Sequence, residues 1–154
     1  MAAHRLLLIR HAKTEPGSPD ESRQLTDRGR RDAAAIGTWL ASSGVVPDVA
    51  VVSPATRARQ TWEIAAGALA GDVPVVVDER IYDNRPDGLM AIARETDESV
   101  QTLAIVGHNP SLEWFMARQG GAGDVPTGTI VVFDVTGAWA DGEVAYAEAE
   151  TCRG

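Results

Sequence analysis

The stretch LLLIRH at residues 6–11 decides how this chain is interpreted. Four consecutive apolar residues are typical of a strand buried on both faces, as in a parallel sheet covered by helices. Arg10 and His11 follow directly, at the point where such a strand ends. In open α/β sheets, ligands bind outside the carboxyl ends of the strands. Arg10 and His11 are therefore expected where a substrate binds.

Two further apolar runs end in the same way. The predicted strand 49–52 is followed by a segment that carries Arg57, and the predicted strand 102–106 is followed by Gly107 and His108. The carboxyl ends of parallel strands meet at one edge of a sheet. We therefore expect the two histidines and two arginines of these segments to converge on one rim.

Apolar periodicity and turn residues predict alternating strands and helices. A polar loop is expected over residues 13–23, and Thr26, Ser53 and Asn109 are each expected to cap the start of a helix. The strands are expected at 5–10, 49–52, 75–77, 102–106, 129–135 and 144–149, and the helices at 26–44, 53–71, 87–95 and from 109 onward. This alternation predicts a single domain over 1–154 with an α/β fold, a three-layer sandwich with a mostly parallel central sheet flanked by helices.

Composition narrows the functional classes. The net charge of −8 argues against binding to nucleic acid or to an anionic membrane, because both require a basic surface. The first apolar run is too short for a signal peptide or a membrane span, so we expect a cytoplasmic protein. No cluster of ligands at metal-binding spacing is visible, and we expect no metal and no cofactor. The single cysteine, Cys152, is expected near a mobile chain end with no catalytic role.

The residue types at the rim suit phosphoryl chemistry. A neutral imidazole at His11 is a competent nucleophile if one ring nitrogen is free and the other donates to a fixed acceptor. The guanidinium of Arg10 offers a planar pair of donors to phosphate oxygens. A strand that simply ends in polar residues is the commoner explanation of an isolated Arg-His pair.

The other two residues have similar alternatives. Arg57 is expected in the first turn of its helix, where the dipole already disfavours a cation, so phosphate binding would account for it. An arginine with its stem on apolar surface and its head in water is the ordinary alternative. His108 would donate to a phosphoryl oxygen, or it is a capping or buried structural histidine. Arg59 points away from Arg57 on the helix and is expected in solvent.

A proton donor for the leaving group is less well defined. Glu79, Tyr82 and Asp83 follow the predicted strand 75–77 and are possible acids. No motif places any of them firmly. A phosphoramidate such as phosphohistidine depends less on a strong enzymic acid than an alkyl phosphate does, so this gap is a hint about the substrate.

Taken together, residues 8–12 (LIRHA), 53–61 (SPATRARQT) and 106–110 (VGHNP) resemble the histidine phosphatase superfamily, in its short SixA-type phosphohistidine phosphatase branch. The segments 25–29 (LTDRG) and 126–128 (PTG) also fit, and Arg23 lies where that branch often has an arginine. The resemblance runs through the whole chain. It implies a phosphoglycerate mutase-like fold and no metal.

By this resemblance, His11 is the nucleophile that becomes phosphorylated, and Arg10, Arg57 and His108 bind the transferred phosphoryl group. The chain departs from the common pattern at Ala12, where glycine is usual, and the acid-bearing segment of larger members is not recognisable. Gln24 also replaces a common proline.

The expected function is hydrolysis of phosphohistidine on a partner protein, because a short chain without the covering insertions of larger relatives suits a phosphate on a protein surface. Two alternatives remain. One is a phosphatase of small phosphorylated substrates, which requires Glu79, Tyr82 or Asp83 as its acid. The other is a phosphate-binding protein without turnover.

Overall fold

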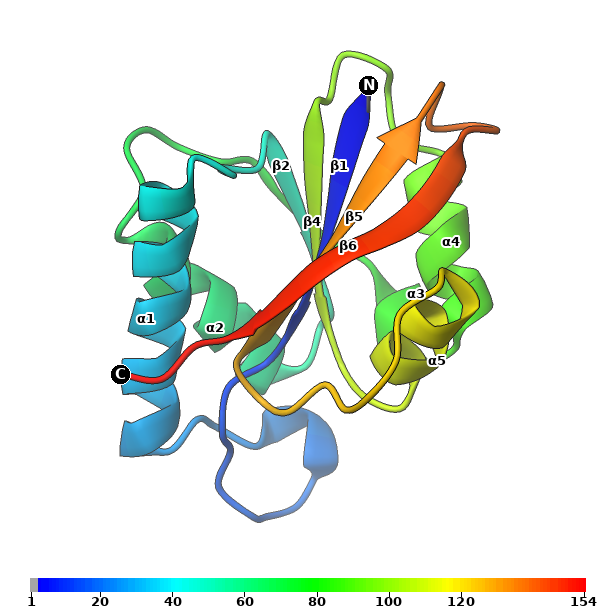
Figure 1. Ribbon diagram of the computed structural model, residues 1–154. Helices are drawn as coiled ribbons and strands as arrows, with labels where there is room; N and C mark the ends of the chain where they lie inside the picture. Colours follow the sequence, from blue (N-terminus) through cyan, green and yellow to red (C-terminus); the bar gives the residue numbers. More distant parts are fainter. Residues whose placement is uncertain (1–2) are drawn as a thin grey trace.

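The central sheet fixes the architecture of the protein, which is described here for residues 3–154 from a computed structural model (Figure 1). Within these residues the sheet has six strands in the order β3-β2-β4-β1-β5-β6. The four strands β3, β2, β4 and β1 are parallel, and β5 and β6 are antiparallel to their neighbours. The strands are β1 His4–Arg10, β2 Val49–Val52, β3 Val75–Val77, β4 Thr102–Gly107, β5 Thr129–Thr136 and β6 Glu143–Thr151.

Helices cover both faces of the sheet. Figure 1 shows α1 and α2 on one face and α3, α4 and α5 on the other. Their bounds are α1 Asp27–Ser43, α2 Thr56–Ala66, α3 Glu79–Tyr82, α4 Pro86–Arg94 and α5 Ser111–Arg118, and a 3₁₀ turn, η1, covers Asp20–Ser22. The predicted three-layer, mostly parallel α/β fold is confirmed.

The apolar run in β1 explains this layering. Leu6 and Leu8 pack in the core under α4 and α5, whereas Leu7 and Ile9 pack in the core under α1 and α2. All four side chains are fully buried. Since successive side chains of a strand point to opposite faces, β1 contributes to both cores at once. This is why the run lacks the alternation of a half-exposed strand.

Two predicted helix ends are confirmed at α1. The Thr26 hydroxyl accepts a hydrogen bond from the backbone N–H of Gly29, and Gly44 ends the helix in the left-handed region with φ 73°. The cap removes one unsatisfied donor from the first turn, and glycine tolerates positive φ without a steric penalty.

The predicted start of α2 is wrong. Ser53 does not cap the helix, which begins at Thr56 with Ala55 at the N-cap position and ends at Ala66, short of Gly71. The Ser53 Oγ instead accepts from the Ala55 N–H and lies 2.8 Å from His108 Nε2. The Ser53 hydroxyl therefore contacts His108 at the carboxyl end of β2, whereas the sequence pattern predicted that it would cap the helix.

The predicted cap of α5 is also wrong. Pro110 occupies the N-cap position, and the Asn109 amide donates to Glu113 and to the Val125 carbonyl. The first N–H of α5, on Ser111, donates to Asn84 Oδ1 at 3.1 Å. A residue 27 positions earlier in the chain thus supplies the cap, which a local sequence pattern does not reveal.

The C-terminal end is packed, in contrast to the mobile end expected around Cys152. Cys152 is 6% exposed and lies in the core beneath α1 and α2. Its N–H donates to the Gly128 carbonyl, and the Gly154 N–H donates to buried Asp32 in α1. Figure 1 shows the chain end beside α1. These bonds anchor the end because Asp32 is a buried carboxylate that requires partners.

The loop after β1 passes beneath the carboxyl ends of the strands, as the blue segment at the bottom of Figure 1 shows. Its two arms are joined by a bridge between Thr14 and Leu25 and by a hydrogen bond from the Thr26 N–H to the Lys13 carbonyl. Between these arms lies the turn η1. The loop therefore holds residues of η1 against the carboxyl ends of the strands.

Candidate active site

The ends of β1, β2 and β4 lie side by side and form the floor of the site. The His11 N–H donates to the Gly107 carbonyl at 3.2 Å, and the Ser53 N–H donates to the Val106 carbonyl at 3.1 Å. Gly107 is required by close packing, because a Cβ there would lie 2.8 Å from Ile81 Cγ2 of α3. The sequence-based expectation that these strand ends converge is thus met by the backbone itself.

A cavity of about 470 Å³ opens over this floor. All four residues singled out in the sequence contribute to its lining, which consists of Arg10, His11, Thr14, Asp20, Arg23, Arg57, Tyr82, Asn84, His108, Asn109 and Thr127. The ring centroids of the two histidines are 5.3 Å apart. The structure therefore brings together four predicted residues that are up to 98 positions apart in the chain, from Arg10 to His108.

His11 is held with one ring nitrogen free. Its Nδ1 lies 2.8 Å from the Ala12 carbonyl, which can only accept, so Nδ1 carries the hydrogen. No hydrogen bond of Nε2 is found within residues 3–154. Burial, with the charges of Arg57 and Arg10 acting in the same direction, lowers the pKa of His11 to about 4. At neutral pH the Nε2 lone pair is therefore available to a ligand in the cavity.

His108 is oriented by Ser53. The Ser53 Oγ accepts the Ala55 N–H and lies 2.8 Å from His108 Nε2, and its hydrogen donates to Nε2 when the ring carries its own hydrogen on Nδ1. This arrangement leaves the hydrogen of the neutral ring on Nδ1, a buried atom without a partner in the part of the chain that the structure describes. Burial lowers the pKa of His108 to about 3. The ring is therefore a neutral hydrogen-bond donor at physiological pH.

Three arginines surround the cavity. Arg10 Nη1 donates to the Val125 carbonyl at 3.0 Å, and its burial lowers its pKa from the usual value. Arg57 is 6% exposed and directs both terminal nitrogens at Asp20. Arg23 lies above them and donates to Asp20 and to Thr14. Arg57 is buried and the other two are partly buried, and guanidinium groups are suited to binding phosphate oxygens in pairs.

Thr61 joins the two segments that carry His11 and Arg57. Its Oγ1 accepts the Ala12 N–H at 3.0 Å and donates to the Arg57 carbonyl at 2.7 Å. The Ala12 carbonyl orients the His11 ring, and the Ala12 N–H is in turn hydrogen-bonded to Thr61 of α2. This buried hydroxyl was in the motif at 53–61, but its spacing alone assigned it no role.

The three possible acids are placed differently. Tyr82 lines the cavity, and its hydroxyl donates to Asp20 Oδ2 at 2.7 Å, a bond that raises the pKa of Tyr82. Glu79 and Asp83 are exposed and are absent from the lining. The structure thus brings one of the three to the cavity, in a state that makes it a weaker proton donor than free tyrosine.

Sequence reasoning missed Asp20, Thr14, Asn84 and Thr127 as lining residues. Asn84 adopts φ 62° and donates to the Asn109 carbonyl at 2.6 Å, which fixes the backbone after His108. Asparagine is among the residues that tolerate this conformation best. The Pro-Asp-Glu-Ser turn around Asp20 lies in the polar loop expected over residues 13–23, and loop residues show no periodicity that points to a site.

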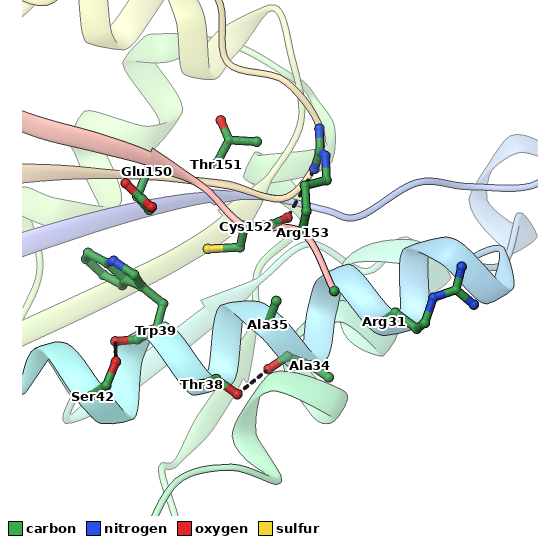
Figure 2. A pocket seen from close by; sticks show the side chains of 11 residues that line it. Arg31, Ala34, Ala35, Thr38, Trp39, Ser42, Glu150, Thr151, Cys152 and Arg153 are labelled. Atoms are coloured by element: carbon green, nitrogen blue, oxygen red, sulfur yellow. Dashed lines mark hydrogen bonds between the residues drawn. The ribbon is translucent and has the colours of Figure 1, made fainter.

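A larger cavity, about 770 Å³, lies elsewhere. Figure 2 shows it between α1 and the end of the chain, with Arg31, Trp39, Cys152 and Arg153 among its lining residues. Its lining includes neither His11 nor His108. Burial raises the pKa of the Cys152 thiol to about 11, so the thiolate needed for nucleophilic chemistry is scarce at neutral pH. The histidines and arginines suited to phosphoryl chemistry line the smaller, polar cavity instead.

Within residues 3–154 no group of three or more histidine, cysteine, aspartate or glutamate side chains is placed to hold a metal ion. In the same range, no helix is long and apolar enough to cross a membrane.

Known proteins share this sequence pattern and fold. Residues 6–85 match the model of the histidine phosphatase superfamily, branch 1. An uncharacterised protein of Mycobacterium tuberculosis is 34% identical over 149 residues, covering 88% of this chain and 92% of the relative.

Two solved structures, both of candidate phosphohistidine phosphatases SixA, are each 28% identical to the chain. The one from Nakamurella multipartitia has a TM-score of 0.83 and covers 99% of this chain and 98% of its own. The one from Agrobacterium tumefaciens has a TM-score of 0.79 and covers 87% of this chain and 93% of its own. The similarity thus extends over nearly the full length.

Proposed function

This chain belongs to branch 1 of the histidine phosphatase superfamily, and on that premise we propose that it is a phosphatase that forms a covalent phosphohistidine on His11 and acts on phosphohistidine in proteins. One observation carries the proposal. The Nδ1–H of His11 is held by the Ala12 carbonyl, which leaves Nε2 unprotonated in a cavity lined by arginines. This is the state that a nucleophilic histidine requires.

In the first step the Nε2 lone pair of His11 attacks phosphorus. An Nε2–P bond forms, and the bond from phosphorus to the leaving group breaks, with its electron pair going to the leaving group. Arg10 and Arg57 bind the phosphoryl oxygens, and His108 Nδ1–H donates to a third. For phosphoryl transfer, such positioning and charge stabilisation account for most of the catalysis.

In the second step a water oxygen attacks phosphorus. An O–P bond forms, the P–Nε2 bond breaks and phosphate leaves, while the proton of the water passes to solvent. The Nδ1–H bond to Ala12 is present throughout, so His11 returns to the tautomer from which it started. The ring needs no rotation between the two steps.

The weak proton donor supports phosphohistidine as the substrate. Tyr82 is the one possible acid in the lining, and its hydroxyl is already bound to Asp20 with a raised pKa. The alcohol of an alkyl phosphate leaves as an alkoxide unless a proton is supplied. A leaving imidazole instead takes its proton from water, or its ring is already protonated in the substrate. The site therefore favours a leaving group that does not need a proton from an enzymic acid.

The proposal is tested by phosphate release from a histidine-phosphorylated carrier domain and from an alkyl phosphate at equal concentration. We expect a strong preference for the carrier domain, with His11→Ala as the blank. Preference for the alkyl phosphate would overturn the assigned substrate and leave a phosphatase of small molecules. Binding of phosphate without hydrolysis of either would overturn the assigned activity.

The protonation state of His11 predicts the acid limit of activity. Because its pKa is lowered to about 4, the free enzyme keeps a neutral nucleophile down to mildly acidic pH. We expect kcat/KM, corrected for ionisation of the substrate, to stay level from pH 7 to 5 and to fall through pH 4. Titration of the His11 Cε1–H signal by NMR should give the same midpoint. A midpoint near 6.5 would contradict the assigned environment.

The contact between Ser53 and His108 predicts a positioning role. We expect Ser53→Ala to lower kcat by about tenfold with little change in KM, since one hydrogen bond of about 1.4 kcal/mol no longer orients the ring. The ¹⁵N shifts of His108 should change from the Nδ1–H tautomer to a mixture. Ser111→Ala is the matched control, because that buried hydroxyl donates to the His108 backbone carbonyl. Equal effects of both variants would contradict the role of Ser53.

A further inference from the structure

An anion that belongs to the chain already occupies the cation-rich cavity. Oδ2 of Asp20 accepts from Arg57 Nη2 at 3.1 Å and from the Tyr82 hydroxyl at 2.7 Å, and Oδ1 accepts from Arg23 Nε at 3.0 Å. These bonds come from three separate parts of the chain. Together they lower the pKa of Asp20 to about 2, with the Tyr82 bond as the largest cause, so the group is a carboxylate at neutral pH.

Asp20 uses the same donors that a phosphoryl group needs. Arg57 directs Nη2 at the carboxylate and Nη1 at the Asp20 backbone carbonyl, at 2.9 Å. The Nη2–H that points at the carboxylate is therefore engaged, and a phosphoryl oxygen accepts that hydrogen bond only if the carboxylate moves. The unliganded site thus holds a carboxylate where the proposed function requires phosphate oxygens.

The carboxylate is the partner that is free to move. The side chain of Asp20 is 53% exposed and begins the turn η1, which contains no buried residue, whereas the Arg57 side chain is 7% exposed and anchored in α2. The exchange leaves no buried charge unpaired, because phosphate oxygens replace the carboxylate at Arg57 and water solvates the half-exposed carboxylate. Asp20 also keeps a partner when it moves, because Arg23 lies three positions away in the same turn.

A displaced carboxylate at the mouth lies beside the leaving group and acts on its charge. Its negative charge favours a substrate whose leaving group is protonated and so departs neutral, and disfavours one whose leaving group departs as an anion. In phosphohistidine, the ring nitrogen that does not bear phosphorus can be protonated, and its N–H is a donor for a carboxylate. An alkyl or aryl phosphate offers no such donor.

We propose that Asp20 is a specificity-determining residue, which the phosphoryl group displaces from Arg57 and which then accepts a hydrogen bond from the protonated ring nitrogen of the phosphohistidine whose imidazole leaves. This inference rests on the proposed function. The Nε2–P bond of His11 forms, the P–N bond of the substrate breaks, and the electron pair goes to the ring nitrogen. The departing imidazole is then neutral, since its other nitrogen already carries the proton, and no enzymic acid is consumed.

The inference is tested with two small substrates, phosphoimidazole and an aryl phosphate, on Asp20→Asn and Asp20→Ala. The ratio of kcat/KM for phosphoimidazole to that for the aryl phosphate is expected to fall about fivefold or more in both variants, the size of one partly exposed charge interaction. Inorganic phosphate should inhibit both variants more strongly than the wild type, because its internal competitor is gone. The backbone carbonyl contact to Arg57 remains in both variants.

Glu21→Gln is the matched control, because it removes one negative charge from the same turn and Glu21 is exposed. It should leave the ratio and the inhibition by phosphate unchanged. If Asp20→Asn and Asp20→Ala keep the wild-type ratio, or if phosphate inhibits them less, Asp20 only orders Arg57 and the inference is overturned. If the wild type itself hydrolyses the aryl phosphate and not phosphoimidazole, the proposed substrate is wrong as well.

Discussion

His11→Ala is expected to lower kcat/KM by about 10⁴-fold or more and to abolish phosphate bound covalently to the protein. The reason is that the variant loses the atom that attacks phosphorus, and the remaining groups only bind and polarise the substrate. Steady-state rates and acid-free detection of bound phosphate measure the two effects. The loss should exceed that of any other single substitution in the cavity.

His4→Ala serves as the control for this variant. His4 is a buried histidine outside the cavity, bonded to Glu98 and stacked on Trp139 with 4.7 Å between ring centroids. The His4→Ala substitution should lower the free energy of unfolding and leave kcat/KM of the folded protein unchanged. Retention of substantial turnover by His11→Ala would mean that water attacks phosphorus directly, which contradicts the assigned mechanism.

Arg57→Lys is expected to lower kcat/KM by about 10²- to 10³-fold, although it retains the positive charge. Arg57 presents two terminal nitrogens in one plane to the cavity side of α2, and lysine has a single ammonium that does not reproduce this pair. Loss of one such donor from a phosphoryl transition state has an effect of this size. The rate with a phosphorylated substrate, and the affinity for inorganic phosphate, should both decrease.

Arg59→Lys is the matched comparison for this prediction. Arg59 lies two residues further along α2, is exposed, and donates to the Pro54 carbonyl and to Thr56. The same chemical change there should alter kcat/KM by less than about twofold. Similar losses in the two variants would show that the effect comes from the surface charge of α2 and would contradict phosphate binding by Arg57.

The fold was predictable because its signals are local. The run at residues 6–9 has the composition of a strand buried on both faces, and its four residues divide between the two cores. Thr26 and Gly44 mark the ends of α1 by backbone preferences that depend on their immediate neighbours. The strand ends then placed Arg10, His11 and His108 at one edge, because parallel strands share their direction.

What could not be predicted depends on contacts between distant segments. Asn84 caps α5 from 27 residues away, and Asp20 meets Tyr82 from 62 residues away. The hydroxyl of Ser53 has a favourable use at a helix start and another at His108, and only the tertiary structure shows which one it takes. Tertiary packing decides which partner each side chain contacts. The local sequence around the residue is the same whichever partner it takes.

The covalent intermediate on His11 is tested most directly by trapping it. The protein is mixed with a histidine-phosphorylated carrier domain, quenched at alkaline pH within the first turnover, digested and analysed by mass spectrometry. We expect a phosphoryl group on the peptide that contains His11, stable to base and labile to acid, on Nε2. A phosphoryl group on His108, or turnover without any phosphorylated histidine, would contradict it.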